Sequence, residues 1–156
     1  DHLVKEILYK DFYGFKNKIK LAKRNSPDAI YETYMLFQSV KEKQREISSS
    51  TLYDLRKYYH PLNDEISQLA DQLVTGALAK GIKRGIAEGN CRKDAKPVAI
   101  ASLVSFIFDS FIQKTIIKPG NQFLSLDNLL DYHLNSICSQ QGKIQWEELK
   151  KIMEKK

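Results

Sequence analysis

The stretch VAIASLVSFIFDSFIQKTII, residues 98–117, decides how this chain folds. Its large apolar side chains are spread around most of the circumference of a helix: Val98, Ile100, Leu103, Val104, Phe106, Ile107, Phe108, Phe111 and Ile112. A helix that is apolar all round has to be covered on more than one side. One side can face the core of its own domain, and a symmetric copy of the same chain is the commonest cover for the other. The stretch therefore predicts a homodimer, with the central helix of a monomer as the alternative.

The same stretch does not predict a membrane span, because Asp109, Gln113 and Lys114 interrupt it and no run of 18 apolar residues occurs in the chain. The first residues alternate charged and apolar side chains, which does not fit a signal peptide. A composition of 42% hydrophobic and 28% charged residues is typical of a globular domain. Cys91 and Cys138 form no CxxC pair, so we expect two free thiols in a reducing cytosol. These features predict a cytoplasmic protein without a membrane partner.

The net charge of +6 raises the question of nucleic-acid binding. The basic residues are spread over all polar faces except between residues 16 and 24, where five occur without an acid: Lys16, Lys18, Lys20, Lys23 and Arg24. Such a run usually forms a solvated helix face. Direct contact with phosphates is the alternative, with the run lying near DNA.

Helical periodicity runs along the whole chain, with apolar residues recurring at steps of three and four. We expect an all-α fold, an antiparallel bundle of about seven helices. Their predicted ranges are 1–23, 27–47, 51–59, 62–88, 94–117, 125–138 and 143–155. Ser26, Thr51 (with Asp54) and Asp94 are the predicted N-caps, and Pro61 and Pro119 mark helix ends. Residues 1–138 form the predicted domain, and 139–156 a C-terminal helical extension packed on it.

No motif for catalysis or cofactor binding is present. Gly76 and Gly81 have the spacing of a phosphate-binding loop, but Ile82 stands where that loop needs lysine. The three histidines share no metal-ligand spacing on a helix. The cluster Tyr58–Tyr59–His60 could serve acid–base chemistry, although packing or pocket lining is the simpler interpretation. We expect no enzyme, no metal and no cofactor.

Three short segments carry a family resemblance. The segment GIAEGNCRKDAKP, residues 85–97, followed by Ala99 and Ala101, is similar to the junction that leads into the first dimer helix of TetR-family transcriptional regulators. Asp54-Leu55 with Tyr58-Tyr59 and Pro61 resembles the short-helix corner of that family, and Asp1-His2-Leu3 resembles the start of its connecting helix. Cys91 departs from the usual large apolar residue, and Asp109-Ser110 from a small glycine-like one. The resemblance covers residues 1–138, the C-terminal ligand-binding and dimerisation domain, without the helix-turn-helix module.

The resemblance implies an effector-sensing domain of a repressor. Helices 94–117 and 125–138 would form a four-helix interface in a homodimer, and we expect its residues to be Val104, Phe108, Phe111, Leu130, His133 and Ile137. A small apolar or amphipathic effector would shift helix 1–23 and thereby change the affinity of the intact protein for DNA. The intact protein would contact DNA only through the absent helix-turn-helix module. A helical small-molecule or lipid-binding module without a DNA partner is the alternative.

The predicted ligand-binding residues follow from periodicity alone. Aromatic and apolar side chains with a few tyrosine hydroxyls are the usual lining of a small-molecule pocket. The residues expected to line it are Phe12, Phe15, Tyr34, Phe37, Tyr58, Leu73, Leu103 and Phe106.

Overall fold

The computed structural model describes residues 2–113 and 125–155, and every regular element within them is an α-helix. The helices are α1 (His2–Asn25), α2 (Ala29–Glu46), α3 (Ser49–Tyr58), α4 (His60–Ala87), α5 (Pro97–Ile112), α6 (Leu126–Ile137) and α7 (Gln140–Glu154). This confirms the all-α prediction. Among these described residues, none of the helices has both the length and the apolar character needed to cross a bilayer.

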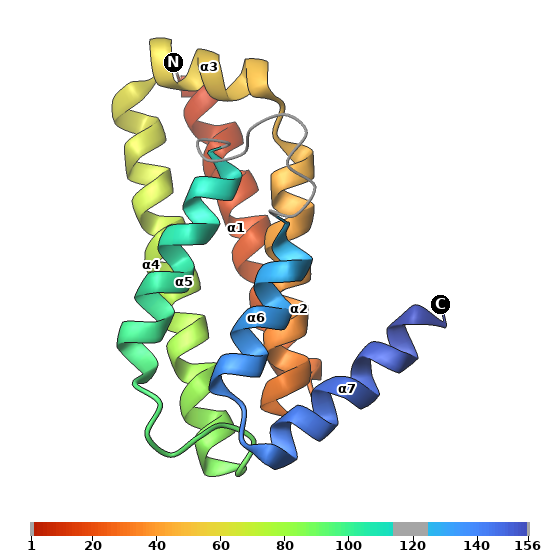
Figure 1. Cartoon of the computed structure of the whole chain (residues 1–156). Coiled ribbons are helices and arrows are strands. Elements are labelled where there is room, and N and C mark those ends of the chain that lie inside the picture. The colour runs from red at the N-terminus through yellow and green to blue at the C-terminus, as the bar shows by residue number, and fades with distance from the viewer. Residues whose placement is uncertain (1, 114–124, 156) are drawn as a thin grey trace.

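The longer helices of the bundle run lengthwise beside one another, and consecutive ones point in opposite directions (Figure 1). They are α1, α2, α4, α5 and α6. The short helix α3 lies across the end of the bundle where α1 begins, and α7 starts at the opposite end and diverges from the bundle axis. The most extensive helix pair is α4 with α5, whereas α7 packs against α2 and α6.

Side-chain caps set several helix starts one or two residues away from the predicted ones. Asp28, not Ser26, caps α2, because its Oδ1 accepts the amide hydrogen of Tyr31 at 2.9 Å. Ser48 caps α3 by accepting the amide hydrogen of Thr51 at 3.0 Å, so Thr51 is inside the helix and does not cap it. Each cap satisfies one amide that the first helical turn leaves without a partner.

The helix predicted over 94–117 is shorter at its start than expected. Asp94 does not cap it; α5 begins at Pro97, and the residue before it, Lys96, makes no side-chain cap. Proline suits this place because its missing N–H would be unpaired in the first turn. Residues 114–117 and the predicted stop at Pro119 lie outside the described residues.

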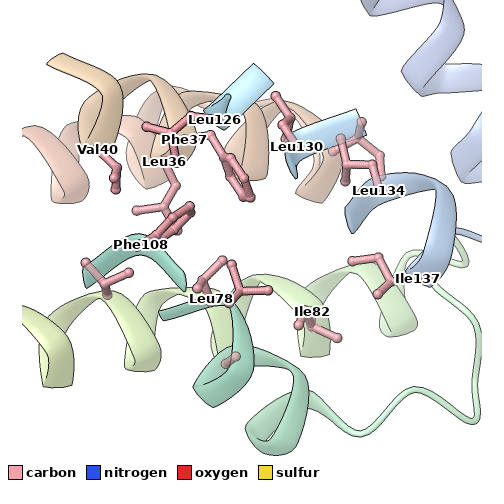
Figure 2. Packing of buried hydrophobic residues seen from close by; sticks show 14 of the residues in the cluster. Leu36, Phe37, Val40, Leu78, Ile82, Phe108, Leu126, Leu130, Leu134 and Ile137 are labelled. Carbon is pink, nitrogen blue, oxygen red and sulfur yellow. The ribbon is translucent and has the colours of Figure 1, made fainter. Parts of the chain in front are cut away.

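The core lies where α2, α4, α5 and α6 meet (Figure 2). Phe37 of α2 and Phe108 of α5 are both almost fully buried, and their rings meet edge to face with centroids 4.6 Å apart. This geometry brings the positive ring edge of one against the negative face of the other, and is worth about 1 kcal/mol beyond the burial itself. Leucines of α6 and Leu78 and Ile82 of α4 close the same core.

The C-terminal helix shares this core. Trp146 and Leu149 of α7 belong to the same buried cluster, and the Trp146 Nε1–H donates to Asp131 Oδ1 at 2.8 Å. Lys150 pairs with the same carboxylate at 2.9 Å. These contacts fix α7 on the α6 side of the bundle, away from α5.

A polar network joins the ends of α2 and α4 on the other side. Arg84 donates to Glu32 at 2.8 Å and to Glu88 at 2.5 Å, and the Glu32 side chain is only 9% exposed. The second oxygen of Glu88 accepts the amide hydrogen of Ala29 at 2.9 Å, the first residue of α2. Buried carboxylates need such partners, because an unpaired buried charge is costly.

Candidate functional site

A cavity of about 110 Å³ opens between α1, α3, α4 and α5, close to the end of the bundle where α1 begins. Its apolar lining consists of Leu8, Phe12, Phe15, Ile47, Leu52, Leu55, Ile66, Ala70, Val74, Phe108 and Ile112. Its polar lining consists of Asp11, Lys43, Asn63, Ser67, Asp71, Ser105, Asp109 and Gln113. An apolar hollow with a few polar groups is the usual composition of a small-molecule site.

Helical spacing explains why these residues converge. Leu8, Phe12 and Phe15 recur at four and three residues and so share one face of α1. The lining of α4 follows the same rule from Asn63 to Val74, and that of α5 from Ser105 to Ile112. Both stripes mix apolar and polar side chains, so the helices that wall the cavity bring hydrogen-bonding groups to it.

The polar groups also tie the wall helices together. The Ser105 hydroxyl of α5 donates to Asp71 Oδ1 of α4 at 2.5 Å. Arg56 of α3 donates to both the backbone oxygen and the side-chain oxygen of Gln113, each at 2.7 Å. Lys43 of α2 forms an ion pair with Asp11 of α1. These contacts join the helices around the cavity. A change in the volume of the cavity would move these helices relative to one another and so disturb the contacts.

One carboxyl at the cavity has a perturbed acidity. The pKa of Asp109 is raised, chiefly because burial penalises the charged form, and the nearby charge of Asp71 adds to the effect. A hydrogen bond with Gln113 and the charge of Arg56 oppose it. Asp11, Asp71 and Asp109 all keep exposed parts, so the acidic groups lie where the cavity meets solvent. The site thus combines an apolar interior with an acidic, hydrogen-bonding mouth.

The structure brings only part of the predicted ligand-binding set to this cavity. Phe12 and Phe15 line it. Phe37 instead packs in the core, Tyr34 is half-buried beside Tyr31, and Tyr58 is 63% exposed on α3. Periodicity identified the apolar face of α1, but it does not tell which core residues border empty space.

The remaining predicted ligand residues lie elsewhere. Leu73 borders a second hollow of about 330 Å³ between α1, α2 and α4. Leu103 and Phe106 are 63% and 70% exposed, so they point away from the cavity. They belong to the outer face of α5, which also carries exposed Val98, Ala99 and Ser102.

The residues predicted to form the dimer interface also lie in a different place from the one expected. All six are buried inside the protomer: Val104, Phe108, Phe111, Leu130, His133 and Ile137. Side chains that fill the core of their own protomer cannot form its outer surface, so the inner and outer faces of α5 are the reverse of those expected. Phe108, expected at an interface, lines the cavity. His133 stacks on Phe37 with centroids 5.7 Å apart.

Sequence reasoning missed the polar lining of α4. Asn63, Ser67 and Asp71 recur at four-residue steps along the face that also carries Ile66 and Val74. This repeat of polar residues along an otherwise apolar helix face is the sequence feature from which the cavity lining could have been predicted. Leu52 and Leu55 of α3 gave no comparable signal, because the helix is too short for a distinctive pattern.

Over residues 2–113 and 125–155, no group of three or more histidine, cysteine or acidic side chains could hold a metal ion. The chain matches no protein-family model, and neither the curated proteins nor the solved structures contain a match to it.

Proposed function

We propose that this chain is the effector-sensing and homodimerising domain of a TetR-type transcriptional repressor. The cavity between α1, α3, α4 and α5 would take a small amphipathic effector, and the outer face of α5 would pair with a second copy. DNA would be read by a helix-turn-helix module outside this chain. The observation that carries the proposal is that α5 carries large apolar side chains on two separate faces, one at the cavity and one exposed.

The cavity supports an effector with a compact apolar part. Its volume of about 110 Å³ is of the same order as the roughly 150 Å³ of an apolar cavity that holds benzene. Phe12, Phe15 and Phe108 would contact this part, and the polar end would lie at the mouth near Asp71 and Asp109. A ligand longer than the cavity would extend through the mouth.

The outer face of α5 supports the homodimer. Val98, Leu103 and Phe106 are each more than 60% exposed, and α7 packs on the other side of the molecule against α2 and α6. Large exposed apolar side chains on one helix mark an interaction surface, and a two-fold axis lets one such face serve both partners.

The end of the bundle near the cavity supports transmission to a DNA-reading module. Leu3 and Ile7 of α1 and Tyr53 and Tyr58 of α3 are exposed there, at the end where α1 begins. A module that docks on both helices would sense any change in their spacing, and both helices line the cavity. The basic run 16–24 lies toward the other end of α1, and Lys18 pairs with Glu42 and Glu46, so we assign it no DNA contact.

Sedimentation of the purified chain tests the dimer. We expect a dimer at micromolar concentration, and a monomer for Phe106→Glu, because two buried like charges would face each other across the axis. Leu21→Glu is the matched control, since Leu21 is an exposed apolar residue of α1. A strict monomer for the unchanged chain would contradict the regulator and favour a small-molecule or lipid-binding module without a DNA partner.

The neutral fluorescent probe N-phenyl-1-naphthylamine tests the cavity. We expect saturable binding at one site per chain, and at least a tenfold loss of affinity in Ala70→Phe, whose ring would occupy the cavity. Ala87→Phe is the matched control, because Ala87 lies at the exposed end of α4. Equal binding to both variants would place the probe elsewhere and refute the cavity as an effector site.

A further inference from the structure

Cys91 and Cys138 lie opposite each other in an isolated antiparallel bridge, although they are far apart in the sequence. Cys91 follows the end of α4, and Cys138 lies between α6 and α7. The Arg92 amide donates to the Ile137 carbonyl at 2.9 Å, and the Ser139 amide donates to the Asn90 carbonyl at 2.9 Å. Both cysteines are free and buried.

The two hydrogen bonds define the type of bridge. They join the neighbours of the cysteines, so the cysteines themselves form a non-hydrogen-bonded pair. In such a pair the Cα atoms are about 4.5 Å apart and the side chains leave the same face. A disulfide needs Cα atoms about 4.4–6.8 Å apart. The backbone of this joint therefore already has the spacing that a disulfide requires.

The joint around the pair is tightly packed. The Ser139 hydroxyl donates to the Gly89 carbonyl at 2.5 Å, and Gly89 adopts a φ of 80°, in the left-handed region that suits glycine. A Cβ on Gly142 would lie 2.0 Å from the Asn90 carbonyl oxygen, so α7 approaches this loop as closely as a glycine allows. These contacts hold the two cysteine backbones in register.

We propose that Cys91 and Cys138 form a dithiol site that closes to an intramolecular disulfide by exchange with a small-molecule disulfide such as oxidised glutathione. The thiolate of one cysteine attacks the glutathione disulfide, forms a mixed disulfide and releases one glutathione thiolate. The thiolate of the second cysteine then attacks the protein sulfur of that mixed disulfide and releases the second glutathione. The two protons lost by the cysteines go to the two glutathione thiolates, so the protein is oxidised by two electrons and the reagent is reduced.

Burial controls when this exchange occurs. It raises the pKa of Cys91 to about 11 and that of Cys138 to about 12. The attacking species is the thiolate, which is scarce in the closed joint at neutral pH. The disulfide therefore forms when the joint opens or while the chain folds, and once formed it is shielded from reductants by the same burial. Closure would fix the start of the α4–α5 connection to the α6–α7 joint.

Refolding of the purified chain in oxidised and reduced glutathione, followed by alkylation and intact-mass measurement, tests the proposal. We expect no alkylation and a mass two hydrogens lower, with a peptide linking Cys91 to Cys138. The disulfide closes a loop of roughly 50 residues, which raises the Tm by about 10 °C. The Cys138→Ser variant, which keeps the size of the side chain, should show no rise on the same treatment.

The mass readout does not depend on whether a variant folds. Mixed glutathione adducts on both cysteines, disulfide-linked pairs of chains, or two free thiols after oxidative refolding would each overturn the proposal.

Discussion

The buried imidazole of His133 makes the stability of this fold depend on pH. His133 is 2% exposed on α6, stacks on Phe37, and its Nε2 finds no hydrogen-bond partner among the described residues. Burial lowers its pKa from the ordinary value of 6.5 to about 4. The folded chain therefore keeps this imidazole neutral at a pH where the unfolded chain protonates it.

The sign and size of the effect follow from linkage. Well above pH 6.5 the imidazole is neutral in both the folded and the unfolded state, so it does not make the free energy of unfolding depend on pH. As the pH falls from 6.5 to about 4, the unfolded state binds more protons than the folded state, so the free energy of unfolding falls. One pKa unit corresponds to about 1.4 kcal/mol, so the loss is about 2 kcal/mol at pH 5 and about 3 kcal/mol at pH 4. For a marginally stable domain this is a large fraction of the total.

Urea unfolding followed by circular dichroism between pH 7.5 and 4.5 measures this loss. The His133→Leu variant is the control, because it keeps an apolar side chain in the core and removes the titrating group. Subtracting the two curves cancels the contributions that the two proteins share, so the difference reports His133 alone. If the difference between the two curves stays flat across this range, the imidazole is not excluded from solvent and the buried packing of α6 is refuted.

Three substitutions test other parts of the structure by chemical denaturation. Arg84→Met should cost about 3 kcal/mol, because it leaves the buried carboxylate of Glu32 without its partner; a loss below 1 kcal/mol would show that water reaches that carboxylate. Gly142→Ala should cost about 2 kcal/mol, since its Cβ would overlap the Asn90 carbonyl, and an unchanged midpoint would contradict the close approach. Phe108→Ala should cost about 4 kcal/mol and enlarge the cavity, so that the naphthylamine probe still binds to any protein that folds.

The helices of this fold could be predicted from sequence because periodicity reports the local pattern of burial. Over the described residues the predicted ranges match the helices closely, and the differences at the starts of α2 and α3 arise from capping. Asp28 and Ser48 were each a suitable cap beside another suitable residue, Ser26 and Thr51. Which of two neighbouring candidates caps a helix depends on the angle at which the chain enters it, and that angle is set by tertiary packing.

The faces of α5 could not be predicted for a different reason. On a helix that is apolar all round, periodicity carries no information about which side is inside. Phe106 and Phe108 are two residues apart and equally apolar, yet one is 70% exposed and the other 2%. Only packing against α2 and α4 distinguishes them. The candidate cavity was located in part, through Phe12 and Phe15, because α1 has a single apolar face.

The position of α5 gives the proposed sensor a second route of communication besides α1. Phe108 and Ile112 wall the cavity from one side of this helix, and Leu103 and Phe106 form its exposed face on the other. A helix moves as a unit over such a distance, because each of its turns is hydrogen-bonded to the next. An effector that displaces the inner face therefore also displaces the outer one. By linkage, the factor by which the effector changes the dimerisation constant equals the factor by which dimerisation changes the affinity for the effector. Effector binding to a sensor built on this helix is therefore coupled to dimerisation. The two are independent only if α5 stays fixed and α1 alone moves.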